Sequence, residues 1–233
     1  MLNTAVAEVL SQFADQLEGA KDLTAAVHDL VLKTIKEHKR IIFNGNGYSD
    51  EWVKEAEKRG LMNLKTTPEA LAHLCDKKNA DVLKKHGVFN DIELKSRYEI
   101  YNENYSKIIN IEALTMIDMT KKLYLPVAAG YGKTLADSAA VKSGLGVDVS
   151  YESDLVKNIG KLTASIYGKV QSLEKAVVEV KSIDEADKLA VYFKDNVISI
   201  MGELRANVDE LEGLIPATEW PVPSYGDLLF SVR

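Results

Sequence analysis

Two long apolar series in the second half of the chain constrain the fold more than any other feature. Steps of three or four residues separate the members of each series, which is the spacing of a narrow seam on one face of a helix. Residues 182–185 (SIDE), between the two series, match a capping box. The pattern therefore predicts two long helices joined by a tight turn, which makes them antiparallel neighbours. The first series is Leu155, Ile159, Leu162, Ile166, Val170, Leu173, Val177 and Val180, and the second is Phe193, Val197, Ile200, Leu204, Val208, Leu211 and Ile215.

The rest of the chain is also helical in pattern, and no segment alternates clearly with a period of two. Pro126 is expected to end or kink the helix that precedes it. The predicted fold class is all-α: a helical bundle with a long antiparallel helical hairpin, counted as a four-helix bundle, preceded by shorter helices. We expect helices over residues 3–17, 23–38, 50–59, 67–86, 91–124 and 127–141, loops at 44–49 and 143–150, and an extended tail from residue 216.

Composition and charge exclude several classes of protein. The formal net charge of -6 does not favour binding to nucleic acid, and the short basic run at residues 36–40 is interpreted as a solvated face. No stretch approaches the ~20 apolar residues that a membrane span needs. Cys75 is the single cysteine, so no intrachain disulfide forms, and the N-terminus lacks the basic region of a signal peptide. We expect a cytoplasmic protein that binds neither nucleic acid nor membrane.

Side chains that commonly carry chemistry stand in no recognisable arrangement. The four histidines are not in metal-ligand spacing. Cys75, beside Leu74, is interpreted as a small core residue rather than a nucleophile. Glu112 interrupts an apolar stretch, but the Glu-x-x-His motifs of di-metal bundles are missing, so a buried or interface salt bridge is expected. The residues therefore indicate no catalytic, cofactor-binding or metal-binding group.

Residues 44–47 (NGNG) form the least helical stretch of the first half. Asparagine and glycine accept unusual backbone angles, so a sharp loop is expected before a helix capped by Ser49. Such a loop resembles an anion cradle, but it lacks the lysine of a P-loop, and Asp50 and Glu51 would repel a phosphate. We favour a structural or interface loop, anchored by Trp52. Its members are Asn44, Gly45, Asn46, Gly47, Tyr48, Ser49 and Trp52.

Six stretches spread from one end of the chain to the other form long and specific phrases. In this order they resemble the C-terminal region of the type III glutamine synthetases, and they are far more specific together than any single motif. They are residues 2–8 (LNTAVAE), 40–52 (RIIFNGNGYSDEW), 54–61 (KEAEKRGL), 96–101 (SRYEIY), 110–116 (NIEALTM) and 220–230 (WPVPSYGDLLF).

The resemblance implies the C-terminal helical part of an ATP-dependent glutamate–ammonia ligase of nitrogen metabolism, which is a large cytoplasmic homo-oligomer. It implies that residues 1–20 are the last helix of a truncated catalytic domain, 21–90 a connecting region of short helices, and 91–233 a C-terminal bundle with an extended tail. ATP and Mg are implied for the full-length enzyme and no cofactor for this chain, since the motifs that bind them lie upstream. The expected partner is the remainder of the catalytic domain.

No catalytic residue is carried over from the family. Its loop near glutamate reads Asn-Gly-Ser-Gly and is followed by histidine, whereas residues 44–47 are followed by Tyr48 and lie beyond the region where that loop belongs. Two functions remain open. The chain is either the C-terminal part of the ligase, inactive alone and structural, oligomer-forming or regulatory in role, or a stand-alone, non-enzymatic helical module that docks other proteins.

Overall fold

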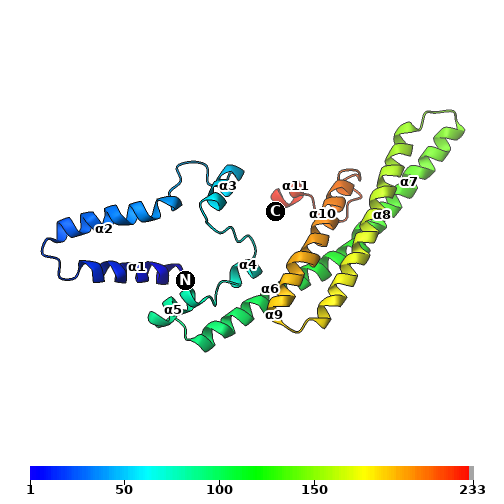
Figure 1. Ribbon diagram of the computed structural model, residues 1–233. Coiled ribbons are helices and arrows are strands. Elements are labelled where there is room, and N and C mark those ends of the chain that lie inside the picture. The colour runs from blue at the N-terminus through cyan, green and yellow to red at the C-terminus, as the bar shows by residue number, and fades with distance from the viewer. Residues whose placement is uncertain (231–233) are drawn as a thin grey trace. The chain divides into compact units, whose positions relative to one another are not determined.

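The computed structural model describes residues 1–230, and all the regular structure among them is helical (Figure 1). The predicted all-α class is therefore confirmed. The chain divides into two compact units, Met1–Tyr101 and Asn102–Arg233, and each is described by itself. No helix in the described part is both long and apolar enough to cross a membrane.

The first unit begins with two helices that contact each other and ends with the start of α6. Asp22 caps α2, and Asn90 and Glu93 form a capping box at the start of α6, with bonds of 2.8 and 2.9 Å. The helices are α1 (Leu2–Leu17), α2 (Leu23–His38), the 3-10 turn η1 (Lys39–Ile41), α3 (Asp50–Lys58), α4 (Thr67–Leu71), α5 (Lys77–Lys85) and α6 (Asp91–Met119).

Few apolar side chains of the first unit are buried. Apolar side chains recur every three or four residues along α1 and α2, but most of these two stripes is exposed, and within α2 no residue is fully buried. The exposed members include Val6, Leu10, Val27, Val31 and Ile35. Cys75 is also exposed, so its interpretation as a core residue was wrong. The five-residue helix α4 ends before it, and backbone bonds from His73 and Leu74 continue only as short turns.

The second unit holds the main hydrophobic core. Its elements after α6 are the π-helical turn η2 (Thr120–Tyr124), α7 (Leu125–Gly144), α8 (Ser150–Glu179), the 3-10 turn η3 (Val180–Ser182), α9 (Ala186–Tyr192), the π-helical turn η4 (Phe193–Val197), α10 (Ile198–Glu212) and α11 (Tyr225–Leu229). Both predicted seams lie in this core, and Ile166, Leu173, Val197, Leu204 and Leu211 are almost fully buried. The predicted hairpin of α8 with α9 and α10 is confirmed.

Polar contacts between the helices establish that α8 runs antiparallel to α10. Lys169 of α8 pairs with Glu203 of α10, and Ser165 accepts a 2.7 Å hydrogen bond from Asn207. Residue numbers therefore fall on one helix as they rise on the other. The same relation holds between η2–α7 and α8, since Glu174 contacts Lys121 and Glu152 contacts Lys142.

Pro126 does not end the long helix. Thr120–Tyr124 form a π-helical turn, and Pro126 then occupies the first turn of α7, where its missing N–H is not needed. The long helix and its continuation are thus consecutive parts of one helical path, seen in green in Figure 1. The four-helix count required the chain to turn back here, whereas the described residues of this unit form three paths: α6 to α7, α8, and α9 to α10.

The predicted capping box at residues 182–185 does not form. Ser182 lies in the 3-10 turn that ends α8, and its hydroxyl donates to the Glu179 carbonyl at 2.7 Å. The N-cap position of α9 is Glu185 rather than Ser182, so α9 begins only at Ala186 and without a side-chain cap. The tail from residue 216 is not extended throughout, because Ser224 caps the short helix α11 within it. Trp220 of the tail is buried and stacks on Tyr124 with ring centroids 5.2 Å apart.

Candidate functional site

The predicted loop lies between η1 and α3 in the first unit and is organised by its own side chains. Asn46 accepts a hydrogen bond from the Tyr48 N–H at 3.0 Å, which is an Asx turn. Its carbonyl accepts from the Ser49 hydroxyl, also at 3.0 Å, and Ser49 accepts from the Trp52 N–H at 3.4 Å. Ser49 is therefore the N-cap of α3, as predicted, and these loop N–H groups are satisfied internally.

Trp52 is held by an aromatic and a cationic neighbour. The Phe43 ring stacks on it with centroids 4.3 Å apart and an interplanar angle of 24°, and the Arg59 guanidinium lies 5.6 Å from its centroid. Phe43 precedes the loop and Arg59 follows α3, so the two ends of the segment meet at Trp52. The loop is thus closed by a small side-chain cluster of Phe43, Trp52 and Arg59.

Arg59 also binds the backbone that leads into the loop. Its Nη1 donates to the carbonyls of Arg40 at 3.3 Å and Ile42 at 2.9 Å, while its Nε contacts the Glu55 carboxylate at 2.6 Å. That hydrogen bond lowers the pKa of Glu55. Sequence reasoning missed Phe43 and Arg59, because no periodic pattern links residues so far apart. The only available signal was that both lie in the phrases that resemble the family.

The glycines of the loop do not adopt the backbone angles that were expected. Positive φ occurs at Gly19, Gly60, Gly87 and Gly146, and at neither Gly45 nor Gly47. At Gly45 the reason for glycine is space, since a Cβ there would lie 2.6 Å from Cζ of Phe43. Nothing lies within 4 Å of a Cβ built on Gly47.

The remaining predicted members of the loop differ in exposure. Tyr48 is fully exposed at its tip, while Ser49 and Trp52 are partly buried. An exposed tyrosine on a loop fixed by Phe43, Trp52 and Arg59 is a suitable contact for another surface, because its aromatic ring is not used within the described chain.

Titratable side chains form pairs rather than a reactive cluster. His86 Nε2 lies 2.7 Å from Glu8, which Lys85 also contacts, and His73 lies 2.9 Å from Asp76. Glu112 is exposed, which contradicts a buried salt bridge, and the alternative of an interface salt bridge stays a prediction. Among residues 1–230, no group of three or more potential ligands stands where it could hold a metal.

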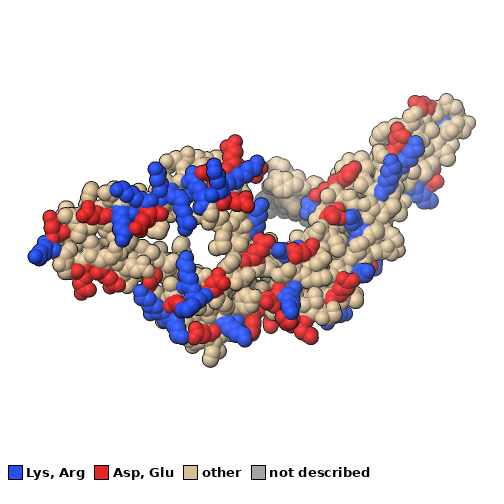
Figure 2. All heavy atoms as spheres, in the orientation of Figure 1, with Lys and Arg blue, Asp and Glu red and all other residues tan. Residues whose placement is uncertain are grey.

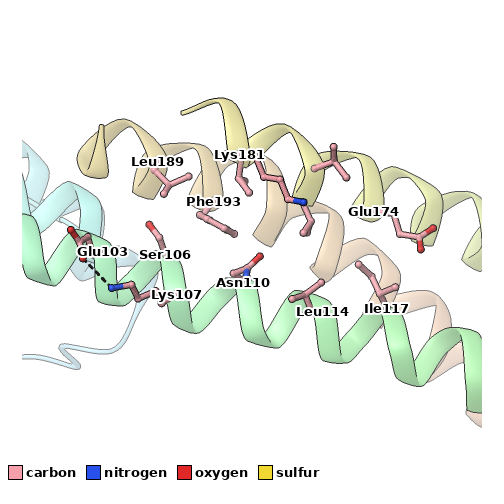
Figure 3. A pocket seen from close by; sticks show the side chains of 13 residues that line it. Glu103, Ser106, Lys107, Asn110, Leu114, Ile117, Glu174, Lys181, Leu189 and Phe193 are labelled. Atoms are coloured by element: carbon pink, nitrogen blue, oxygen red, sulfur yellow. Dashed lines mark hydrogen bonds and ion pairs between the residues drawn. The ribbon is translucent and has the colours of Figure 1, made fainter. Parts of the chain in front are cut away.

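The second unit contains a mainly apolar cavity of about 560 Å³ (Figure 3). Leu114 and Ile117 of α6 face Phe193 of η4 across it. At its rim, Glu103 and Lys107 form an ion pair of 3.0 Å. This largely apolar cavity offers contact surface, and it does not bring together a nucleophile and a base.

Neither the loop nor the cavity identifies a function, but comparison with known proteins identifies a family. A family model described as the glutamine synthetase C-terminal domain matches residues 26–143. A glutamine synthetase of Butyrivibrio fibrisolvens is 38% identical over 214 residues, which is 91% of this chain and 31% of that protein. A type-3 glutamine synthetase of Dictyostelium discoideum is 32% identical over 99% of this chain and 32% of its own length.

A glutamine synthetase of Bacteroides fragilis (strain YCH46) is 28% identical over 99% of this chain and 33% of its own length. The chain thus spans about a third of the length of these relatives. The matched segment contains the loop, α3 and nearly all of the helical path through α6 and α7. The chain belongs to the glutamine synthetase C-terminal domain family.

Proposed function

We propose that this chain is the C-terminal helical part of an ATP-dependent glutamate–ammonia ligase. The observation that carries the proposal is the family match at residues 26–143, supported by relatives named glutamine synthetase that align with 91% or more of the chain. The proposed role is structural, oligomer-forming or regulatory, in a cytoplasmic homo-oligomer. We propose that residues 1–20 are the last helix of the catalytic domain, residues 21–90 a connecting region of short helices, and residues 91–233 the C-terminal bundle with its tail.

Exposed apolar side chains on α1 and α2 support docking to the remainder of the catalytic domain. Leu10 of α1 is 60% exposed and Val31 of α2 is 51% exposed, although both belong to regular helical stripes. Apolar stripes of this kind normally pack against a core. Their exposure here therefore indicates a surface that binds another part of a protein. The relatives are about three times as long as this chain, so their additional length can contain the part that covers α1 and α2.

The described residues do not fit the Mg that glutamine synthetases use, and the loop at residues 44–49 does not fit the phosphates of ATP. No cluster of potential ligands is present among residues 1–230 to hold a divalent metal. The loop at residues 44–49 is also a poor phosphate cradle, because Tyr48 and Trp52 N–H groups bond within it and Asp50 and Glu51 follow. We therefore propose a structural or interface role for the loop and assign no step of the ligase reaction to this chain.

A domain exchange tests the proposal. The matched C-terminal third of the Butyrivibrio fibrisolvens enzyme is replaced by this chain, and ATP-dependent glutamine formation is compared with that of the intact relative and of the relative truncated without replacement. We expect the chimera to be more active than the truncated enzyme and to assemble like the intact one. A chimera that assembles and reacts no better than the truncated enzyme would contradict the proposed role.

The isolated chain is expected to form no glutamine from glutamate, ammonia and ATP, because no described residue is placed to bind the metal or carry the phosphoryl transfer. The measurement is release of phosphate together with glutamine by the purified chain, with the intact relative as the positive control. Glutamate-dependent turnover by the chain alone would show that the catalytic role had been assigned to the wrong part.

A further inference from the structure

A basic cavity of about 630 Å³ lies beside the loop in the first unit. Its basic lining consists of Lys36, Lys39, Arg40 and Arg59, and Ile35, Ile42 and Asn44 complete it. Figure 2 shows Lys and Arg side chains close together at the end of α2, and both basic and acidic side chains over α3. No acidic side chain is among the described residues that line this cavity.

The positive charges around the cavity are largely uncompensated. Arg59 is paired with Glu55, but Lys36, Lys39 and Arg40 have no ion pair or side-chain hydrogen bond within residues 1–230. Lys36 lies in the last turn of α2 and complements the helix dipole, and the dipole effect is confined to that turn. It does not account for Arg59, which reaches the same cavity from the end of α3.

The cavity is also preformed on one side. Arg59 is fixed by the Glu55 carboxylate, by the carbonyls of Arg40 and Ile42, and by the face of Trp52. These contacts tie the η1 backbone, which carries Lys39 and Arg40, to the end of α3. Residues that are separate in sequence are therefore held around one space before any ligand arrives, which lowers the entropic cost of binding.

We propose that this cavity binds a small molecule that carries two linked phosphate groups. Two phosphates carry about three to four negative charges at neutral pH, which matches the three uncompensated cations. The volume lies within the range of small-ligand sites, about 300–1,000 Å³. The chain as a whole is acidic, so a long polyanion such as nucleic acid would be repelled outside the cavity. This site does not depend on the proposed function.

Calorimetric titration of the full chain with inorganic pyrophosphate tests the site. At about 20 mM salt, where screening is weak, we expect saturable binding that weakens as salt is added. Lys39→Gln/Arg40→Gln should raise the Kd about tenfold or more, while leaving the Arg40 carbonyl that Arg59 binds. The charge-preserving Lys39→Arg/Arg40→Lys variant should bind nearly as well as the original chain.

Lys65→Gln/Lys95→Gln removes the same charge from exposed lysines outside the cavity and should change the Kd less than about twofold. Orthophosphate should bind at least about tenfold more weakly than pyrophosphate, because it meets fewer of the cations. The proposal is overturned if pyrophosphate shows no saturable binding, if the control variant weakens it equally, or if orthophosphate binds as tightly. Circular dichroism and unfolding of each variant exclude loss of folding as the cause.

Discussion

Gly45 illustrates how one position in the loop depends on the side-chain cluster around Trp52. A Cβ at residue 45 would lie 2.6 Å from Cζ and 2.9 Å from Cε1 of Phe43. The Phe43 ring has to move to admit it, and movement breaks the stack on Trp52. We expect Gly45→Ala to destabilise the first unit by about 1–3 kcal/mol, as overpacking does. Urea unfolding followed by Trp52 fluorescence, in a Trp220→Phe background, measures the change.

Gly47→Ala is the matched control for Gly45→Ala. Its φ is not positive and a Cβ there meets nothing within 4 Å, so we expect a change within about 0.5 kcal/mol or a slight stabilisation. Equal destabilisation by both substitutions would mean that the backbone, rather than the Phe43 ring, requires glycine in this loop.

Glu8 is the residue at which stability and pH are coupled. Hydrogen bonds from Lys85, Gln12 and His86 lower its pKa from 4.5 to about 2. Because the folded pKa lies below the unfolded one, the contribution of Glu8 is fully present above the unfolded pKa of about 4.5 and is lost as the pH falls towards 2. We expect Glu8→Gln to be less stable than the original chain at pH 7, and this difference to shrink between pH 5 and pH 2.

The pH prediction is measured by urea unfolding of the first unit, with Glu18→Gln as the control. Glu18 follows the same helix and is exposed, and it makes no side-chain ion pair among the described residues. A stability difference for Glu8→Gln that stays constant from pH 7 to pH 2 would show that the substitution acts through packing and not through the charge of the carboxylate.

Single helices differ in how far their sequence determines them. The seams of α8 and α10 could be predicted because burial repeats every three or four residues, and that repeat is visible locally. The π-helical turn before Pro126 could not, since a proline in a helical pattern predicts only that the helix ends or kinks near it. The capping box at residues 182–185 did not form because Ser182 belongs to the 3-10 turn that ends α8, and α9 starts three residues later than the box requires.

In the loop, too, the local features could be predicted from the sequence and the long-range contacts could not. Ser49 and the start of α3 follow from local signals, which act over three residues. The contacts of Arg59 with Arg40 and Ile42 span 19 and 17 residues, and no local pattern selects those carbonyls. In the sequence, Lys36, Lys39 and Arg40 form only a short basic run. Arg59 joins them at the cavity through its long-range hydrogen bonds to the carbonyls of Arg40 and Ile42, which the sequence does not reveal.

The packing of the hairpin can be tested at its two apolar seams. Ile166 and Leu204 are fully buried, so we expect Ile166→Ala or Leu204→Ala to cost about 2–5 kcal/mol of the free energy of unfolding. Val178→Ala, on the same helix α8 but 62% exposed, should change it by less than about 0.5 kcal/mol. The measurement is denaturant unfolding followed by circular dichroism. A seam variant as mild as Val178→Ala would mean that the hairpin does not pack through these residues.

At the scale of the whole molecule, the two units differ in how much apolar surface they cover. The second unit has a continuous core from Ala113 to Trp220, whereas the first leaves the stripes of α1 and α2 largely exposed. The free energy of burying those stripes is therefore still available for association. This imbalance is expected of a segment that completes its packing against another part of a larger protein, as the proposed function requires.

The last prediction separates docking from folding. Leu10→Gln/Val31→Gln removes apolar surface from α1 and α2 where it is already exposed, so each substitution should change the unfolding free energy of the isolated chain by less than about 0.5 kcal/mol. In the chimera with the Butyrivibrio fibrisolvens enzyme the same pair should lower glutamine formation and assembly, because buried glutamines would meet an apolar partner surface. Val141→Gln, 66% exposed on α7, is the control and should leave both unchanged. Sedimentation and activity measured on the same samples decide the matter: if the pair and the control behave alike, the stripes of α1 and α2 are not the docking surface.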